Sequence, residues 1–330
     1  MERAKTLTFM TKSIAIHYLA LLTMLIMVNS IHITDSFASE SNGHPLVGKI
    51  WSVNTSNFVS PNALRSEVLK SQHTIVGETH DNKEHHEIQA KILKWLIQDG
   101  QRINPVFEML SEDQINPIRN LNLTSSDVFF DKVAWETTGW PDRSLYKPIF
   151  DIVISEKMQI TPAEMQRDSL LKLIKNGKNS LPKNILQSLK LVVLDNNARQ
   201  LIEKEIIDSH CGMLPKKMVS PMILGQRVRD VVMANSVAQA GSNGPTILFA
   251  GSGHGRKDFG VPAYLSKMNP NQRIVSIALI ETLNEITTAN EYSQIWASDV
   301  MPFDYIWFTK RVNRKDPCEE LKDHFKNHPA

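Results

Sequence analysis

Several residue types are scarce in this 330-residue chain, and each shortage excludes a class of protein. Only two cysteines are present, Cys211 and Cys318, so no disulfide framework is expected; an exported chain could pair them, or both could lie buried as free thiols. No C-x-x-C-H motif occurs, which excludes a c-type cytochrome. The net charge is only +2 and no dense run of lysine and arginine is present, so the sequence predicts no nucleic-acid partner.

Long hydrophobic runs are absent except near the N-terminus. There, the apolar run at 14–28 covers about 15 residues, whereas about 20 are needed to span a bilayer. Basic residues precede it, and Ser36-Phe37-Ala38 after it has the small-x-small form of a cleavage site. Residues 1–38 are therefore predicted to be a secretory signal peptide, with an uncleaved membrane anchor as the alternative. We expect an exported protein of the periplasm or cell envelope, and no lipobox cysteine follows the run to carry a lipid.

The rest of the chain contains short apolar runs rich in Val, Ile and Phe, most of which end in a residue that can carry chemistry. Such runs are typical of the buried strands of a parallel sheet. Helical patterns lie between them, and residues 73–110 form one predicted β-α-β unit with a helix at 84–98. The sequence predicts an α/β fold, a mostly parallel sheet flanked by helices, with a smaller helical lobe inserted at about 112–240 and a polar C-terminal tail at 311–330. The predicted strands end at or near Glu78, Glu108, Glu164, His254, Glu281 and Thr309.

The ends of these predicted strands carry carboxylates and histidines. In an open parallel sheet, ligands bind outside the carboxyl ends of the strands, so Glu78, Glu108 and His254 are expected at one edge. His80 follows Glu78 in the same loop, and a set of this kind suits a divalent metal or general acid–base chemistry. The alternative for each carboxylate is a solvated loop residue.

Two further histidines, His85 and His86, fall in the first turn of the helix that follows. Adjacent residues of a helix point about 100° apart, so at most one of them can face the same site. We expect His85 to line the site and His86 to lie at the surface or behind it. No H-E-x-x-H helix is present, so a zincin-type protease is not supported.

The stretch "AGSGHGRKDFGVP" at 250–262 is the second dense region. Gly251 and Gly253 allow a ligand to approach the backbone closely, and His254 would project beside it. Arg256 is suited to bind a carboxylate or propionate in a bidentate manner. The alternative is a surface turn, and neither a Walker loop nor G-x-G-x-x-G is present to indicate a nucleotide.

Four residues of the predicted helical lobe are expected to support the site rather than to act in it. A polar ladder that ties a helix to the sheet explains them at least as well as catalysis does. They are His210, Gln226, Arg229 and Asp230.

Several stretches, in this order, resemble the ChaN family of bacterial haem-binding, iron-regulated lipoproteins, which belongs to a wider group with Tiki-type metalloproteases and erythromycin esterases. They are "VGETHDNKEHH", "VFEML", "GWPDRSLYKPI", "HCGMLP" with "MVSPMILGQRVRDVVMA", and "FAGSGHGRKDFGVPAYL". The resemblance covers residues 45–310. It departs from the family at the missing lipobox cysteine and at "ITPAEMQR", where Glu164 changes the edge of the pocket.

The resemblance implies a sheet lobe with a helical lobe, an envelope location, and haem held between the two subunits of a homodimer. It further implies a tyrosine ligand to the haem iron, Tyr146 by motif position, with Tyr292 and Tyr305 as alternatives, and a histidine from the opposing subunit. A tyrosine can ligate haem iron as a phenolate, although a packed core tyrosine is the simpler reading of Tyr146. Envelope haem-transport components would be partners.

Two functions from different classes follow. The first, which we favour, is an exported haem-binding protein for haem or iron uptake, in which Tyr146, His85, Arg256 and His254 bind the cofactor. The second is a hydrolase of the esterase or peptidase type at the same edge. In that case Glu78 or Glu108 activates a water, and His80 and His254 bind a divalent metal or stabilise an oxyanion.

Overall fold

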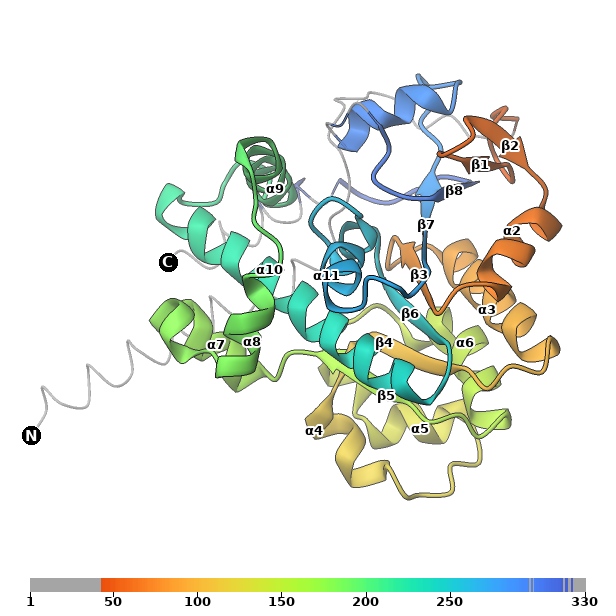
Figure 1. Cartoon of the computed structure of the whole chain (residues 1–330), viewed down its shortest axis with the longest axis horizontal. Coiled ribbons are helices and arrows are strands. Elements are labelled where there is room, and N and C mark those ends of the chain that lie inside the picture. The colour runs from red at the N-terminus through yellow and green to blue at the C-terminus, as the bar shows by residue number, and fades with distance from the viewer. Residues whose placement is uncertain (1–42, 297, 299, 317, 320–321, 323–330) are drawn as a thin grey trace, which may run out of the picture.

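The computed structural model describes residues 43–296, 298, 300–316, 318, 319 and 322 (Figure 1). The predicted signal peptide lies outside these residues. An eight-stranded sheet runs through the molecule in the order β2-β1-β8-β7-β3-β6-β4-β5. Six of its strands are parallel, and all six arise from the predicted apolar runs, which confirms the α/β fold with a mostly parallel sheet. These strands are β3 (His73–Glu78), β4 (Asn104–Ser111), β5 (Thr161–Glu164), β6 (Thr246–Gly251), β7 (Ile274–Glu281) and β8 (Tyr305–Thr309).

Two short strands, β1 (Ile50–Ser52) and β2 (Asn57–Val59), extend the sheet beyond β8 and were not expected from the sequence. Both run antiparallel to their neighbours. Each has only three residues and β2 is largely exposed, so neither has a hydrophobic pattern long enough to be recognised.

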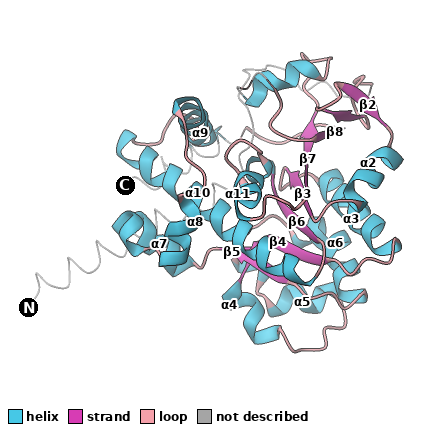
Figure 2. Ribbon diagram, viewed as in Figure 1, coloured by secondary structure: helices cyan, strands magenta, loops and turns pink. Residues whose placement is uncertain are grey.

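Helices cover both faces of the sheet (Figure 2). Because successive strand residues point to opposite faces, Val76 and Ile75 of β3 belong to different cores. Val76 packs with α2 (Pro61–Leu69), α3 (Lys83–Gln98), α4 (Glu112–Ile115), α5 (Ser126–Lys132) and α6 (Arg143–Ser155). Ile75 packs with α7 (Arg167–Asn176), α8 (Lys183–Leu189), α10 (Lys216–Ala240) and α11 (Val261–Met268).

The inserted helical lobe is smaller than the sequence indicated. The interval 112–240 contains the strand β5, and α5 and α6 within it pack on the sheet. Among the described helices, only α9 (Asn196–Ser209) belongs to neither sheet core, and α7 and α8 gather with it beside the first half of α10 (Figure 1). A small separate core, with Ile202 and Ile206 against Met222, holds α9 on α10.

The connections that leave β3 and β6 go to opposite faces of the sheet. From β3 the chain enters α3 on one face, and from β6 it passes through a 3-10 turn (Ser252–Gly255) into α11 on the other. The two strands are neighbours, so a topological switch point lies between their carboxyl ends, where open sheets of this class bind ligands. The remaining 3-10 turns are Asn116–Ile118, Trp135–Thr137, Gly177–Ser180, Gly241–Asn243 and Asn290–Trp296.

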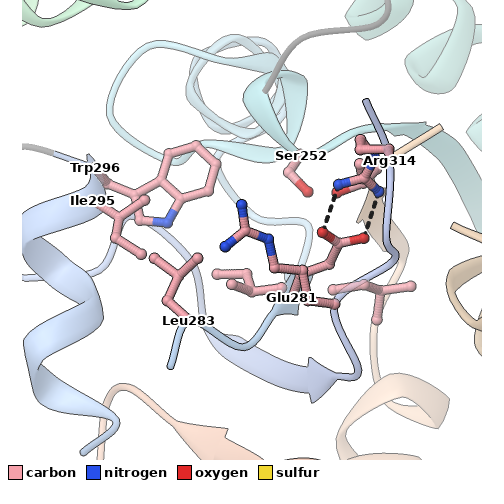
Figure 3. Close-up of a pocket in the computed structure, with 10 residues that line it drawn as sticks. Ser252, Glu281, Leu283, Ile295, Trp296 and Arg314 are labelled. Carbon is pink, nitrogen blue, oxygen red and sulfur yellow. Dashed lines mark hydrogen bonds and ion pairs between the residues drawn. The ribbon is translucent and has the colours of Figure 1, made fainter. Parts of the chain in front are cut away.

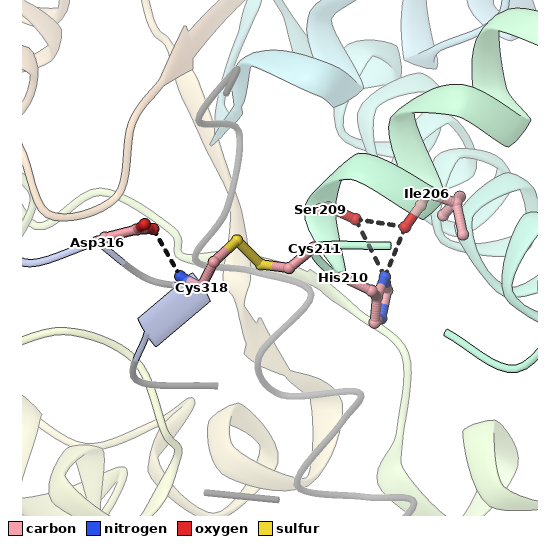
Figure 4. The surroundings of a disulfide bond; sticks show 6 residues. All are labelled: Ile206, Ser209, His210, Cys211, Asp316 and Cys318. Carbon is pink, nitrogen blue, oxygen red and sulfur yellow. Dashed lines mark hydrogen bonds between the residues drawn. A yellow bond between two sulfur atoms is a disulfide. The ribbon is translucent and has the colours of Figure 1, made fainter. Parts of the chain in front are cut away.

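The chain beyond β8 crosses this carboxyl edge. Arg314 pairs with Asp81 of the β3–α3 loop and with Glu281 at the end of β7. A disulfide then joins Cys318 to Cys211 after α9, with 5.6 Å between the Cα atoms (Figure 4). The described part of the predicted polar tail therefore links the sheet to the helical lobe. Across the described residues, no helix combines the length and the apolar character needed to cross a membrane.

Candidate ligand-binding site

Glu78, the last residue of β3, is fully buried with its side chain on the α3 face of the sheet. Its Oε1 accepts a hydrogen bond of 2.8 Å from Nδ1 of His80. Its Oε2 lies 3.1 Å from Nε2 of His86 but has no hydrogen bond within the part of the chain that the structure describes. The geometry favours a different acceptor for that nitrogen, the carbonyl oxygen of His80 at 2.9 Å. One oxygen of this buried carboxylate is thus left unsatisfied.

The ring of His80 lies at the switch point. Only one of its two ring nitrogens, Nδ1, has a hydrogen-bond partner among the described residues. The ring contacts Trp140 edge-on at 4.8 Å and lies over Gly251, where a Cβ atom would come within 3.1 Å of the ring. Its Nε2 has no hydrogen-bond partner in the described part of the chain, and the residue keeps 6% of its surface exposed. Burial opposes protonation, but the charge of Glu78 and its hydrogen bond outweigh this effect and raise the pKa of His80.

Glu108, on the α10 face of β4, is buried with both oxygens satisfied. Oε1 accepts a 2.7 Å hydrogen bond from Arg229 and lies 3.2 Å from Nε2 of His254, while Oε2 accepts a 2.7 Å bond from the backbone N–H of Gly251. Burial alone would raise the pKa of Glu108, but His254 and Arg229 hold it well below its usual range. Arg229 also reaches Glu164 at 3.0 Å and so joins the ends of β4 and β5.

His254 is fixed at both ring nitrogens. Its Nδ1 lies 2.6 Å from Asp230 and 3.3 Å from Nε2 of Gln226, both on α10. Although burial opposes protonation, the charges of Glu108 and Asp230 raise the pKa of His254 to about 9. The predicted ladder residues on α10 therefore tie that helix to the sheet edge, and His254 has no nitrogen left for a cofactor.

Arg256 does not occupy the position that its expected role requires. Its guanidinium is buried and makes a bidentate pair with Asp258, at 3.0 and 2.6 Å. It also stacks against the rings of Phe259 at 4.3 Å and Trp296 at 5.4 Å. The expectation that it binds a propionate is therefore not supported, because Asp258 already pairs with its charge and two aromatic rings lie close to its guanidinium.

Both adjacent histidines are fully buried, so neither lies at the surface. His85 points away from Glu78, accepts a 2.8 Å hydrogen bond from the backbone N–H of Thr79, and bonds Thr309 at 2.7 Å. Burial lowers the pKa of His85 well below its ordinary value. His86 is the one beside Glu78. His86 thus lies behind His80, one of the two places expected for it, whereas His85 bonds Thr79 and Thr309 instead of lining the site with Glu78.

The tyrosines and His210 are placed as packing residues. Tyr146 is 0% exposed, lies against the rings of His86 at 4.2 Å and Trp135 at 4.8 Å, and its hydroxyl has no hydrogen-bond partner among the described residues. The hydroxyl of Tyr292 accepts a 2.7 Å bond from a backbone N–H, and Tyr305 lies on β8, away from the switch point. The side chain of His210, which directly follows α9, bonds Ser209 and Ile206 of that helix (Figure 4).

Two hollows border this region. A pocket of about 70 Å³ opens at the ends of β3, β6 and β7, beside Thr79 and Ser252 (Figure 3). A wider groove of about 850 Å³ runs between α3 and α6. The residues that line the groove include no histidine, tyrosine, cysteine or methionine, so it offers no ligand to a haem iron. Among the described residues, no group of three or more His, Cys, Asp or Glu side chains is arranged to hold a metal ion.

Three residues of this region were not assigned to the site from the sequence, namely His86, Trp140 and Arg311 of the small pocket. The pattern contains no signal for the first, because the helix rotation comes from packing. Trp140 lies in the stretch "GWPDRSLYKPI", which also contains the expected ligand Tyr146, and this position in the sequence could have indicated that Trp140 lies near the site. Arg311 belonged to the segment that was set aside as a polar tail.

The sequence and the fold of this chain are similar to those of known proteins. The family model described as "Haem-binding uptake, Tiki superfamily, ChaN" matches residues 64–265. A solved structure titled "Cofacial heme binding to ChaN of Campylobacter jejuni" superimposes with a TM-score of 0.62 at 19% identity, covering 78% of this chain and 95% of that one. The type III effector HopBA1 gives a TM-score of 0.40 at 8% identity, over 84% of this chain and 98% of its own, too low to support an argument. No curated protein matches the sequence.

Proposed function

The chain belongs to the haem-binding ChaN family of the Tiki superfamily, and on that premise we propose that it binds haem at the carboxyl edge of its sheet with His80 as a ligand to the iron. The observation that supports this most is the state of His80: Nδ1 is held by Glu78, and Nε2 has no hydrogen-bond partner among the described residues. Histidines that ligate metals commonly donate their other ring N–H to a carboxylate, which orients the ring and makes it more basic. Glu78 would have that role.

Tyr146 is the second candidate for the iron ligand. Its unpaired hydroxyl is what a ligand atom would offer, but the side chain is enclosed on all sides. A phenolate would also have to form beside carboxylates, and burial together with the charges of Glu78 and Glu108 raises the pKa of Tyr146 well above its ordinary value. We therefore assign Tyr146 to packing and His80 to ligation.

The residues present fit haem in their ligand chemistry, but the small pocket at this edge is not large enough to enclose it. The pocket at this edge measures about 70 Å³, whereas sites that enclose an organic ligand usually measure about 300–1,000 Å³. When bound, haem would supply an iron centre that accepts a lone pair from a nitrogen such as Nε2 of His80. His80 and the partly exposed ring of Trp140 would meet one face of the macrocycle. We propose that a second copy of the chain covers the other face, in a homodimer.

The setting that we propose is outside the cytoplasm, in haem or iron uptake with envelope transport components as partners. The Cys211–Cys318 disulfide supports it, because such bonds persist mainly in oxidising compartments.

Titration with hemin tests the proposal. We expect the wild-type protein to shift the Soret band, His80→Gln to weaken binding at least tenfold, and Tyr146→Phe to leave both the spectrum and the affinity unchanged. His44→Gln, a partly exposed histidine before β1, is the matched control. Absence of a Soret shift in the wild type would contradict haem binding. A loss in Tyr146→Phe alone would move the ligand role to the tyrosine. Sedimentation with and without hemin tests the homodimer.

The hydrolase alternative gains no specific support. A general base must reach the proton that it removes, directly or through a water. Glu78 is 0% and Glu108 is 1% exposed, and both oxygens of Glu108 already accept hydrogen bonds or an ion pair. No ester or peptide would meet either carboxylate in this conformation.

A further inference from the structure

The small pocket beside His80 has features that the proposed iron ligation does not use. This edge pocket is bounded by Thr79, Ser252, Leu283, Ile295, Trp296 and Arg311 (Figure 3). It combines apolar walls with polar groups at the ends of three adjacent strands. It therefore has the character of a binding site rather than of a packing defect.

Two hydrogen-bond donors of the edge pocket lack acceptors. Nε1 of Trp296 is buried without a hydrogen-bond partner, and Arg311 makes neither a hydrogen bond nor an ion pair within the described ranges. The neighbouring arginines differ, because Arg256 is paired with Asp258, and Arg314 with Asp81 and Glu281. A buried N–H is normally paired, so an unpaired one beside a free guanidinium suggests an acceptor that arrives with a ligand.

The charges around the edge pocket permit an anion to enter. Glu281 lines the pocket, but Arg314, which also pairs with Asp81, binds both oxygens of Glu281 at 2.8 and 2.6 Å and offsets part of its charge. The free cation is Arg311, whose planar guanidinium matches the two oxygens of a carboxylate. Leu283 and Ile295 provide an apolar wall for the alkyl arm that carries such a group.

We propose that the edge pocket is a carboxylate-binding subsite that takes a propionate side chain of haem, with Arg311 and Nε1 of Trp296 as the donors. This proposal rests on the proposed function. The two subsites are contiguous, because Thr79 precedes His80 in the chain and Ser252 follows Gly251, over which the ring of His80 lies. Arg311 then has the role that the sequence suggested for Arg256. A free short-chain carboxylate presents the same chemistry and is the other possible source.

The first test uses a free carboxylate and needs no haem. In ¹⁵N-labelled protein, the indole N–H resonance that disappears in Trp296→Phe belongs to Trp296. We expect sodium butyrate, added at constant ionic strength, to shift that resonance, and Arg311→Gln to weaken the effect at least tenfold. Arg102→Gln, an exposed arginine just before β4 at the opposite edge, should behave as the wild type. No butyrate-dependent shift would overturn the carboxylate subsite whether or not haem binds.

The second test separates the two sources of the carboxylate. We expect Arg311→Gln to weaken hemin binding about tenfold and to leave the affinity for hemin dimethyl ester, which lacks free carboxylates, unchanged. An equal loss for both compounds would mean a structural effect and would overturn the propionate assignment. If butyrate shifts the Trp296 resonance but the wild type does not bind hemin, the proposed function fails. The ligand is then a free carboxylate, and the propionate assignment is overturned.

Discussion

Glu78 ends β3 and Glu108 lies in the second half of β4, two strands of one sheet that are separated by β6, and both residues are buried, yet their surroundings are opposite. On the α10 face, Glu108 is satisfied by a guanidinium, an imidazole and a backbone N–H. On the α3 face, Glu78 keeps one oxygen without a hydrogen bond, and the hydroxyl of Tyr146 is likewise unpaired. Satisfied buried networks rigidify a structure, whereas unsatisfied groups are costly and tend to mark function. The difference suggests that the Glu108 network is the scaffold and the Glu78 side is the site.

The largest effect on stability should come from removing Arg229, the cation of the Glu108 network. Arg229→Met leaves Glu108 and Glu164 buried without their guanidinium, which should cost about 3–5 kcal/mol in the free energy of unfolding measured with urea. Arg119→Met is the matched control, because Arg119 pairs with Glu112 at the surface and should cost at most about 1 kcal/mol. Equal losses would show that the buried network does not carry the stability assigned to it.

The scaffold should also give the protein a stability that falls at alkaline pH. The pKa of His254 is raised to about 9, so its contribution is complete below the unfolded value of about 6.5 and is lost as the pH rises through about 9. The loss should be on the order of 3 kcal/mol. Urea unfolding between pH 6 and pH 10 measures it, and the difference between the wild type and His254→Gln isolates this residue from His80. Parallel profiles for the two proteins would contradict the prediction.

Haem binding, by contrast, should depend on the other carboxylate, Glu78. Glu78→Gln removes the charge that holds Nδ1 of His80, so hemin affinity should fall about tenfold, as is usual when the partner of a ligating histidine is changed. Glu108→Gln should lower stability but leave the affinity of the folded protein nearly unchanged. Spectrophotometric titration of both variants at a temperature where each is folded measures the contrast. The opposite order of effects would exchange the roles of scaffold and site.

The smallest effect on stability should come from removing a single hydroxyl, that of Tyr146. Tyr146→Phe deletes a buried group that makes no hydrogen bond, so stability should be unchanged or rise by up to about 1 kcal/mol. Tyr292→Phe is the matched control, since it removes the acceptor for the N–H of Leu283 and should cost about 1–2 kcal/mol. Thermal and urea unfolding of the pair give the answer, and a loss in Tyr146→Phe as large as in Tyr292→Phe would show that its hydroxyl is satisfied after all.

The fold was largely accessible from the sequence, and the site only in part. The six apolar runs correspond to the six parallel strands. Asn82, expected at the start of the following helix, does cap α3, because its side chain accepts hydrogen bonds from the backbone N–H groups of Glu84 and His85. The strand ends brought Glu78, Glu108 and His254 to one edge, as expected for a parallel sheet. The accessible nitrogen of His80 could not be distinguished from the occupied ones of His254, because a residue type does not reveal its partners.

The sequence by itself determined the strands, their common edge and the chemical groups at that edge, because hydrophobic periodicity and strand polarity are local properties. Only the tertiary structure decided which groups are satisfied. The contact between Arg229 and Glu108 joins residues 121 positions apart, and the rotation of α3 that places His86, not His85, beside Glu78 is set by the burial of Ile88 and Ile92 in the core. Partner choice depends on such distant packing, so it is absent from any single stretch of the chain.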